Sequence, residues 1–508
     1  YRRLNRESSR FANLLKALGV KPGDKALLLL PNLPQTVIAY YGILKAGGVI
    51  VCTTPLSPVQ ELVRQVRDSG ATVLVTLTKL AEAARAVKAQ TNLQHIIFTS
   101  VKDYLPEPKR FLFMLLREAR EGHRLPFALE PGMHLLASEL YKHGPHAPEV
   151  EVQPNDPALI QYTSGTTAQP KGVMLSHFNL VANALQTRHW IPSLGEGRET
   201  FLSVVPFSHV YGMTVSMNVP VALAATMVVL PEFRTQTVLK TIRRYRPSIF
   251  PGVPNMYVAI NNFPGVRRFG IGSVKACISG GSPLPVEVQE AFEKLTRGRL
   301  VEGYGLTEAT TVTHGNPFLR RRKVGSIGIP LPSTEAKIID LATGKDLPPG
   351  RIGELVIRGP QVMLGYWNDH TRSWLTRDGW LLTGDVARAD EDGYFQISSR
   401  KADMWYPGKP GEPAFPRDVE EALFEIPQVK EAAVVAIANQ PVAFVIAQKD
   451  RPTAEALIAY CKRRLPPELV PRLVIFVDDF PRTFIGKVLR REMATRYEAM
   501  LARGPAPR

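Results

Sequence analysis

The spacing of apolar residues along the first hundred positions alternates between helical and strand-like segments. Helical spacing keeps one face of a segment apolar, whereas a short continuous apolar run suits a buried strand. On this basis we predict helices from Phe11 towards Gly19, over residues 35–45 and over residues 61–69, and strands over residues 25–30 and 71–77. Helices that alternate with strands favour parallel sheets with helices on their faces, so the pattern predicts an α/β fold.

The pattern changes near Arg400, where a compact group of shorter elements begins. We predict helices over residues 419–424 and 454–465, and strands over residues 429–437, 442–448 and 473–477. A group of about a hundred residues suits a separate small domain. We therefore expect a large N-terminal domain of layered α/β sheets over residues 1–400 and a small α+β C-terminal domain over residues 401–508.

Composition supports a globular chain of more than one domain. The 508 residues exceed one ordinary core, and 44% hydrophobic with 21% charged residues argue against disorder. Cys52, Cys277 and Cys461 form no CxxC pair, which argues against a disulfide framework or zinc site and favours a reducing cytoplasm. The longest apolar run, residues 219–230, is broken by Pro220 and is too short to span a bilayer, and no signal-peptide pattern is visible. We expect a cytoplasmic protein and leave peripheral contact with the inner membrane face open.

The formal net charge of +17 attracts nucleotides, anionic lipid surfaces and nucleic acid alike. The sequence has neither zinc-finger spacing nor the basic–aromatic alternation of RNA-binding proteins, so we predict no nucleic-acid partner. Charge alone does not choose between a nucleotide and a membrane surface.

Residues 101–148 interrupt the alternation with an apolar run at 111–116. The run is bordered by basic residues, namely Lys109, Arg110, Arg117, Arg120 and Arg124. One interpretation is an interfacial helix through which residues 105–124 touch an anionic membrane. The other, which we favour, is an ordinary helix packed on the body with a solvated basic side, because short amphipathic helices mostly face a core.

A dense set of hydroxyl and glycine residues follows the apolar segment 159–162. The set consists of Thr163, Ser164, Gly165, Thr166 and Thr167, with Lys171 and Gly172 beyond Pro170. Hydroxyls and backbone amides at this density suit a phosphate group, and the lysine adds positive charge. The segment lacks the GK[ST] ending of the common nucleoside-triphosphate loop, and alone it is equally compatible with a surface turn.

Later segments favour the phosphate interpretation. They are ISGGSPL at residues 278–284, EGYGLTE at 302–308, TGD at 383–385, SRK at 399–401 and PRTFIGKVLRRE at 481–492. In this order they resemble the signature motifs of the adenylate-forming superfamily, most closely its long-chain fatty acyl-CoA synthetases. The resemblance covers nearly the whole chain and implies an AMP-forming acid–thiol ligase.

The resemblance also implies an ATP site built from these segments. Tyr304 would present a flat face to adenine, and Asp385 with Arg400 would hold the ribose hydroxyls. Glu308 would bind Mg²⁺ together with Thr163, because hard oxygen ligands suit this ion. The ATP-binding residues so implied are Thr163, Ser164, Gly165, Thr166, Thr167, Lys171, Gly281, Ser282, Pro283, Tyr304, Gly305, Thr307, Asp385 and Arg400. Without the motifs, Tyr304 would be read as a core tyrosine and Glu308 as a surface carboxylate.

Lys487 is the residue to which the resemblance assigns catalysis, with Thr163 and Glu308 as its partners. Its ammonium group would neutralise the substrate carboxylate and the α-phosphate where the new bond forms. It follows Gly486 in the C-terminal domain, which is mobile in the family, so it would act only when that domain closes. Ile485 stands where the family usually has serine.

Two apolar segments, residues 205–213 and 251–257, resemble walls of the family's acyl pocket, and their composition fits an alkyl tail. The acyl-contacting residues that we infer are His209, Tyr211, Gly212, Gly252, Val253 and Gly280. For His209, a hydrogen-bonded core histidine is as acceptable as a direct substrate contact.

The implied reaction has two steps. A long-chain fatty carboxylate and ATP, with Mg²⁺, give acyl-AMP and pyrophosphate, and coenzyme A as co-substrate then takes the acyl group and releases AMP. A fatty acyl-AMP ligase with another acceptor and a non-catalytic nucleotide- or acyl-binding homologue stay open as alternatives. Oligomerisation also stays open.

The sequence departs from the family pattern mainly where the second step is expected. Ala402 occupies the hinge position, residues 405–416 are longer and rich in proline, and the loop at 438–441 is shortened. Ala168 replaces a glycine of the phosphate loop. We hypothesise that adenylation is kept while the coenzyme A step is altered.

Overall fold

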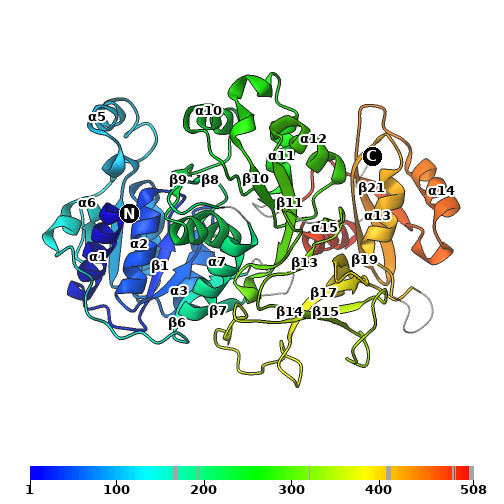
Figure 1. The fold of residues 1–508 in the computed structure, drawn as a ribbon, viewed down its shortest axis with the longest axis horizontal. Helices are drawn as coiled ribbons and strands as arrows, with labels where there is room; N and C mark the ends of the chain where they lie inside the picture. Colours follow the sequence, from blue (N-terminus) through cyan, green and yellow to red (C-terminus); the bar gives the residue numbers. More distant parts are fainter. Residues whose placement is uncertain are drawn as a thin grey trace.

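The computed structural model describes residues 1–163, 170–191, 194–319, 321–407, 413–482, 486 and 488–502, with the backbone alone at 499–502. Figure 1 shows the largest sheet at one end of an elongated molecule and the elements that follow residue 400, here called the C-terminal unit, at the other. The predicted architecture of layered α/β sheets with a smaller α+β unit is confirmed.

The largest sheet has eight strands in the order β16-β7-β6-β2-β1-β3-β4-β5. These are β1 (Lys25–Leu29), β2 (Val49–Cys52), β3 (Val73–Leu77), β4 (His95–Thr99), β5 (Met133–Leu135), β6 (Pro157–Tyr162), β7 (Gly172–Ser176) and β16 (Gly365–Tyr366). The pairs among β1 to β6 are parallel, whereas β7 and β16 are added antiparallel at one edge. The strands predicted over residues 25–30 and 71–77 are confirmed by β1 and β3.

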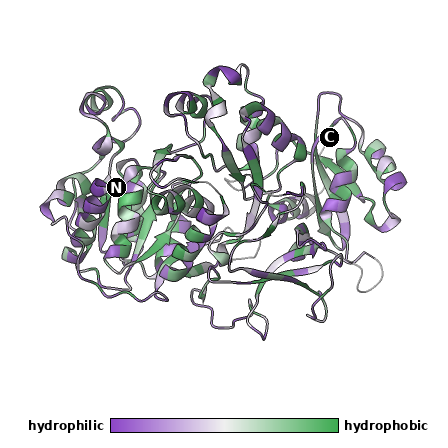
Figure 2. Ribbon diagram, viewed as in Figure 1, coloured by the Kyte–Doolittle hydropathy of each residue, from purple (hydrophilic) through white to green (hydrophobic). Residues whose placement is uncertain are grey.

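Helices pack beside this sheet and supply its apolar cover (Figure 2). They are α1 (Arg2–Ala17), α2 (Pro34–Lys45), α3 (Val59–Ser69), α4 (Ala81–Ala89), α6 (Leu136–Glu139) and α7 (His177–Trp190). In α3, Leu62 and Val66 lie one turn apart and are buried, and the helix ends at Gly70, whose φ of 70° suits glycine. The predicted helices are confirmed by α1, α2 and α3.

The middle of the molecule contains a mixed sheet in the order β10-β11-β12-β13 and the parallel pair β8–β9. Their strands are β8 (Thr200–Ser203), β9 (Thr226–Val229), β10 (Ala276–Ser279), β11 (Arg299–Gly305), β12 (Val312–Gly315) and β13 (Ile329–Pro330). The surrounding helices are α8 (Val210–Met213), α9 (Val219–Ala222), α10 (Thr235–Tyr245), α11 (Pro254–Asn261) and α12 (Val286–Thr296). Ile249 links the two groups because it bridges both Phe201 and Ala276.

An antiparallel sheet precedes the C-terminal unit. Its strands are β14 (Glu335–Ile339), β15 (Gly353–Arg358), β17 (Leu381–Ala389) and β18 (Phe395–Arg400). Strand β18 ends directly before the short helix η8 (Lys401–Asp403), so this sheet leads the chain into the C-terminal unit.

The C-terminal unit contains α13 (Pro416–Phe424), β19 (Val429–Ile437), β20 (Gln440–Ala447), α14 (Ala454–Arg464), β21 (Leu473–Phe476) and α15 (Arg490–Ala502). All five elements that we predicted here are confirmed. Two hydrophobic clusters, one around Val434 and one around Phe444, consist only of residues beyond 400. The shortened loop between β19 and β20 is a two-residue turn at Ala438 and Asn439, with φ of 50° and 61°, as tight hairpins require.

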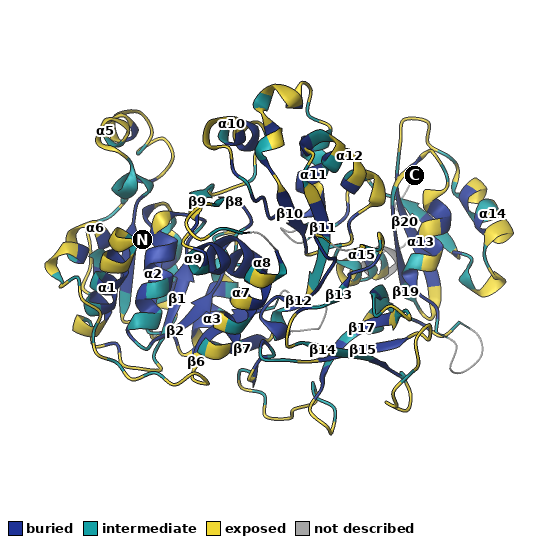
Figure 3. Cartoon of the chain, in the orientation of Figure 1, coloured by how far each residue is buried: buried dark blue, intermediate teal, exposed yellow. Residues whose placement is uncertain are grey.

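Helix α5 (Glu107–Leu116) stands away from the body beside the N-terminal end of the molecule (Figure 1). Only Phe113 among its residues is buried, and Figure 3 shows the helix almost wholly exposed. The interpretation that we favoured, a helix with its apolar side packed on the body, is therefore wrong. Across the part of the chain that the structure describes, no helix is long and apolar enough to cross a membrane.

Candidate active site

The predicted phosphate segment lies between the two strands of a β-hairpin. Strands β6 and β7 pair antiparallel with Tyr162 opposite Gly172, and the backbone N–H of Thr163 donates to the carbonyl of Lys171 over 3.0 Å. The hairpin thus brings Thr163 and Lys171 together where its connecting loop begins and ends. The remaining residues of this prediction, Ser164, Gly165, Thr166 and Thr167, and Ala168, lie outside the described residues.

Asp385 and Arg400 are partners across the strands β17 and β18. Arg400 Nε lies 2.7 Å from Asp385 Oδ1, and the Tyr304 hydroxyl donates to Asp385 Oδ2. Asp385 is buried, and its charge raises the pKa of Arg400, so the guanidinium stays protonated. An ionised carboxylate has about four acceptor sites, so this one retains capacity for the two hydroxyls of a ribose.

Glu308 belongs to a second chain of contacts that reaches the base of the phosphate hairpin. The Tyr366 hydroxyl donates to Glu308 Oε1 over 3.0 Å, and the Lys171 ammonium lies 4.6 Å from the centre of the Tyr366 ring. Lys171 also pairs with Asp369 at 3.1 Å. The charge of Glu308 helps to raise the pKa of Arg400. This set of contacts is therefore linked electrostatically to the cluster of Asp385 and Arg400.

Tyr366 and Asp369 were not among the predicted site residues. They follow β7 by nearly two hundred residues and reach Lys171 because β16 pairs with β7 at the sheet edge. The aromatic and polar run at 366–369 was the available signal, but its pairing partner could not be seen from the sequence.

The donor set suits a metal ion that arrives with phosphate ligands. Glu308 offers a hard carboxylate oxygen, and in the described ranges no three acidic, histidine or cysteine side chains gather around a common point. Magnesium usually takes one or two carboxylates and completes its shell with phosphate and water oxygens. The residues present therefore fit Mg²⁺ bound to ATP, and the share of Thr163 in holding it stays a prediction.

The glycine-rich turn after β10 lies beside the end of β11. Strands β10 and β11 are parallel with Ser279 opposite Glu302, which brings the segment of Gly280, Gly281, Ser282 and Pro283 next to Tyr304. Gly305 occupies a register shift where a Cβ would overlap the carbonyl of Thr311, so glycine is required beside the tyrosine. Thr307 follows at the start of the short helix η7 (Thr307–Ala309), which carries Glu308.

Glu302 is a titratable group at this turn that the sequence did not single out. Burial raises the pKa of its carboxyl group to about 7, although a backbone hydrogen bond from Leu284 and the charge of Arg417 oppose the rise. A carboxyl group beside the predicted nucleotide segment therefore changes its protonation near neutral pH.

The predicted acyl-contacting residues meet around Tyr211. Its hydroxyl donates to the carbonyls of Gly252 and Ile278, over 3.1 and 2.6 Å, and its ring lies against Gly280. Val253 follows Gly252 directly and is buried. A Cβ at Gly212 would overlap the carbonyl of Pro206, so glycine is also required at the start of α8. The structure thus brings both predicted walls together.

His209 has a structural role in this group. Its Nδ1 accepts a hydrogen bond from the backbone N–H of Tyr211 over 3.1 Å and caps α8. Burial lowers the pKa of the imidazole to about 4, so it is neutral at physiological pH. The interpretation as a hydrogen-bonded histidine thus has direct support, and a substrate contact stays a prediction.

Gly486, the residue before Lys487, lies against the second acyl segment. A Cβ added to it would be 2.6 Å from Asn255 Nδ2, and its φ is 88°. Arg482 donates from Nη1 to the carbonyl of Gly486 over 3.3 Å and forms an ion pair with Glu431. Arg482 was not predicted to take part in the site. Lys487 and Ile485 lie outside the described residues.

The two departures from the family pattern in the C-terminal unit touch each other. The backbone N–H of Tyr406 donates to Asn439 Oδ1 over 3.1 Å, and the Asn439 amide donates to the Tyr406 carbonyl. Trp405 also pairs with Ala414 across residues 408–412, which are not among those described. The described start of the proline-rich segment, at Tyr406, and the shortened hairpin turn are therefore joined by two hydrogen bonds.

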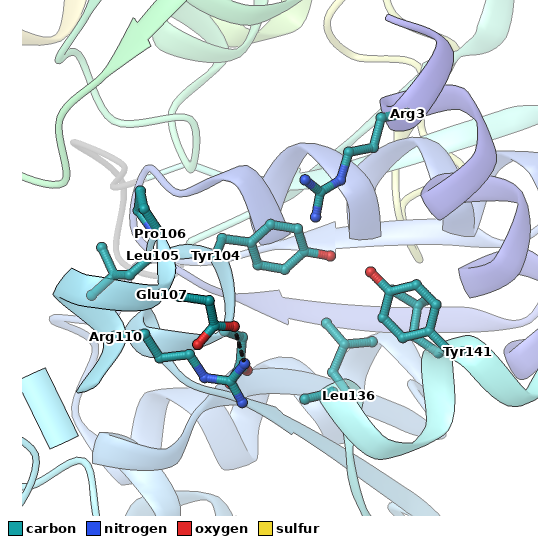
Figure 4. A pocket seen from close by; sticks show the side chains of 11 residues that line it. Arg3, Tyr104, Leu105, Pro106, Glu107, Arg110, Leu136 and Tyr141 are labelled. Carbon is teal, nitrogen blue, oxygen red and sulfur yellow. Dashed lines mark hydrogen bonds and ion pairs between the residues drawn. The ribbon is translucent and has the colours of Figure 1, made fainter.

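A cavity of about 600 Å³ lies away from these residues, at the foot of α5 (Figure 4). Arg3, Tyr104, Arg110, Leu136 and Tyr141 belong to its lining, and Arg110 pairs with Glu107. No residue of the predicted ATP or acyl site lines it, so its position does not bear on the chemistry of that site.

Comparison with known proteins agrees with this arrangement. A family model described as AMP-binding enzyme matches residues 1–367, and one described as AMP-binding enzyme C-terminal domain matches residues 418–487. A long-chain-fatty-acid–CoA ligase of Bacillus subtilis (strain 168) is 41% identical, over 96% of this chain and 88% of the relative. One of Escherichia coli O6:H1 (strain CFT073) is 35% identical, over 97% of this chain and 89% of the relative. The solved structure of ATP-bound MatB from Rhodopseudomonas palustris has a TM-score of 0.85 at 26% identity, covering 98% of this chain and 93% of that one.

Proposed function

The chain belongs to the AMP-binding enzyme family, and from this premise we propose that it activates a long-chain fatty acid with ATP and transfers it to coenzyme A. The names of its Bacillus and Escherichia relatives support both the acid and the acceptor. The observation that carries the proposal is the joint cluster of Tyr304, Asp385 and Arg400 with Glu308 at the edge of the phosphate hairpin.

In the first step a carboxylate oxygen of the acid attacks the α-phosphorus of ATP, and the bond to the departing pyrophosphate breaks. Asp385 would hold the ribose and thereby fix the position of the α-phosphorus, which makes the attack effectively intramolecular. Lys171 and Lys487 would place positive charge on the phosphates and on the reacting carboxylate. The remaining phosphate contacts would come from Thr163 and residues 164–167.

Magnesium would enter with ATP and be held by Glu308 and Thr163, where it supplies positive charge to the phosphate oxygens. Tyr366 supports this role because its hydroxyl fixes one oxygen of Glu308. Adenine would lie along Tyr304 beside the turn at 281–283, with Gly305 and Thr307 completing that side.

In the second step the sulfur of coenzyme A attacks the acyl carbon, the bond from that carbon to the AMP oxygen breaks, and the thiol proton is released. We propose that residues 401–508 form a mobile domain that rotates against residues 1–400 between the steps. The separate hydrophobic clusters of the C-terminal unit support this division. Contacts across the boundary include the hydrogen bond from Arg417 to the Ile397 carbonyl, 3.0 Å long.

The acyl chain would run along the group formed by Tyr211, Gly212, Gly252, Val253 and Gly280, with His209 at its mouth. The buried apolar residues around this group suit an alkyl tail. The contact between the altered segments at Tyr406 and Asn439 is compatible with the hypothesis of a modified coenzyme A step. The relatives' names favour coenzyme A as the acceptor.

We further propose that the enzyme acts in the cytoplasm with peripheral contact to the inner membrane face through residues 105–124. A long-chain acid partitions into bilayers, so contact would shorten its path to the enzyme. The exposure of α5 supports this part of the proposal.

The test is a panel of acids from acetate to palmitate, with ATP, Mg²⁺ and coenzyme A, in which AMP, acyl-AMP and acyl-CoA are all quantified. We expect kcat/KM to rise at least about 100-fold from acetate to palmitate, because each buried methylene adds about 0.8 kcal/mol. Equal amounts of AMP and acyl-CoA support the ligase. Acyl-AMP that accumulates while coenzyme A is not consumed would favour the acyl-AMP ligase, and the absence of both acyl-AMP and acyl-CoA with every acid would contradict both.

A further inference from the structure

Helix α5 carries an unusually complete apolar surface for its length. Five of its apolar side chains are exposed, namely Phe111 (68%), Leu112 (54%), Met114 (46%), Leu115 (69%) and Leu116 (59%). Because successive helical residues turn by about 100°, these five occupy an arc of about 200°. Such an arc is wider than the stripe that packs one helix on one neighbour.

Basic residues border this arc on both sides. At the same rotation of about 100° per residue, Lys109 lies just beyond one edge, and Arg110 and Arg117 lie beyond the other. Arg120 and Arg124 follow in the turn after the helix and are exposed. An apolar face framed by cations is the arrangement that lies in the headgroup region of a bilayer with anionic lipids.

Contacts in and around α5 fold residues 102–123 into a small unit of their own. Phe113, on the opposite side from the apolar arc, packs its ring against His123 with 5.6 Å between ring centres. Lys102 and Glu118 form an ion pair that closes the same small unit at its base. A cavity of about 600 Å³ lies between the foot of α5 and the helices α1 and α6 (Figure 4), and the exposed side chains from Phe111 to Leu116 show that the body does not cover the apolar arc.

We propose that α5 is a membrane anchor that inserts its apolar arc, from Phe111 to Leu116, into an anionic phospholipid bilayer. This inference gives a named surface and a lipid class to the peripheral contact in the proposed function, on which it rests. A bilayer fits better than a second protein chain for two reasons. A helix of ten residues is only about 15 Å long, which is short for a stable interface of about 800 Å² per partner. The cations frame the arc on both sides, as an anionic surface requires.

The test is co-sedimentation of the full chain with vesicles of phosphatidylglycerol and phosphatidylcholine, compared with vesicles of phosphatidylcholine alone. We expect the chain to prefer the anionic vesicles. The double variant Phe111→Ser/Leu115→Ser should bind them at least about tenfold more weakly. The matched control, Phe178→Ser/Val181→Ser, removes two apolar side chains of α7 that are 47% and 58% exposed, and it should change binding less than about twofold.

A second pair of variants separates local charge from the total charge of the chain. Arg117→Glu/Arg120→Glu should weaken binding by more than about fivefold for each position, because each basic residue near an anionic surface contributes about that factor. Lys462→Glu/Arg463→Glu makes the same charge change on α14, at the far end of the molecule (Figure 1), and should have a much smaller effect.

Three results would overturn the proposal: no binding of the wild type to anionic vesicles, equal losses in the α5 and α7 variants, or loss of self-association in the α5 variant without a change in vesicle binding. The last result would assign the surface to a second copy of the chain. Acyl-CoA formation from a detergent-dispersed acid without vesicles should stay within about twofold in all of these surface variants. That control separates failure of the anchor from failure of the proposed reaction.

Discussion

Arg400 Nε lies 2.7 Å from Asp385 Oδ1, and the two residues face each other in the register of β17 and β18. The ion pair is thus built by strand pairing at the end of the sheet that leads into the C-terminal unit. Because Asp385 is buried and also accepts from Tyr304, its position is fixed before a nucleotide binds. A preorganised carboxylate of this kind is well suited to hold a ribose.

We expect Asp385→Asn to raise the KM for ATP by about tenfold or more, because charged hydrogen bonds contribute about 1.5–3 kcal/mol. Steady-state kinetics with ATP varied at saturating acid would measure this. The matched control is Glu335→Gln, which removes another cross-strand ion pair of the same sheet, the 2.8 Å pair with Arg358 on the surface. An equal effect of both substitutions on the KM would show that Asp385 acts only by stabilising the sheet and not by binding ATP.

Tyr366→Phe should lower kcat/KM for ATP by about fivefold, because Glu308 loses a hydrogen bond worth about 1 kcal/mol. The loss should shrink as Mg²⁺ is raised if, as we propose, the hydroxyl orients the carboxylate of Glu308 towards the metal. Titration of activity with Mg²⁺ checks this. Tyr394→Phe is the control, because Tyr394 also has a lysine, Lys323, 4.9 Å from its ring centre, but its hydroxyl donates to the carbonyl of Arg321 and not to a carboxylate. A loss that does not depend on Mg²⁺ would contradict the orienting role.

Arg482→Ala should reduce the rate of adenylation by about tenfold, with less effect on the KM for ATP, because Gly486, the residue before the predicted catalytic lysine, loses its hydrogen bond. Arg482→Lys should restore part of the rate. Arg472→Ala removes a similar surface arginine of the same unit, which donates to Gln440 over 3.2 Å, and should leave the rate unchanged. Single-turnover formation of acyl-AMP is the measurement, and an unchanged rate in Arg482→Ala would show that its contact with Gly486 plays no part in adenylation.

Glu302 should make stability depend on pH. The pKa of its carboxyl group is about 7 in the folded protein, above the ordinary 4.5. The stability that the protonated group gives the folded state is therefore fully present below pH 4.5 and is lost as the pH rises through 7. Glu302→Gln cannot ionise, so it should become more stable than the wild type by about 2 kcal/mol between pH 5 and pH 8. For a chain of this length the difference corresponds to about 2 °C in Tm. The measurement is the Tm of both proteins between pH 5 and pH 8. The same change in Tm with pH for both proteins would contradict the raised pKa.

The sequence predicted best those elements whose apolar spacing is regular. The strand predicted over residues 429–437 has those bounds in the structure, and α14 ends one residue before its predicted end. Helix α5 shows where spacing is insufficient, because an apolar face does not say whether protein or another phase covers it. For that reason our prediction that the apolar face of α5 packs on the rest of the protein was wrong.

For the site, the motifs predicted residues that the structure brings together, but not the contacts that connect them. Tyr366 donates to Glu308 across 58 positions, and Lys171 pairs with Asp369 across 198. Both contacts depend on the pairing of β16 with β7, and β16 has only two residues. Long-range pairing of such a short strand leaves no periodic pattern in the sequence, and so Tyr366 and Asp369 could not be predicted.

The most direct test of the proposed reaction is ATP–pyrophosphate exchange driven by a long-chain acid, in the absence of coenzyme A, for the wild type and for Lys487→Ala. We predict exchange that requires palmitate in the wild type and a loss of about 100- to 1,000-fold in the variant, as expected when a charge at the developing bond is removed. Absence of exchange with every acid, or exchange that Lys487→Ala leaves intact, would contradict it.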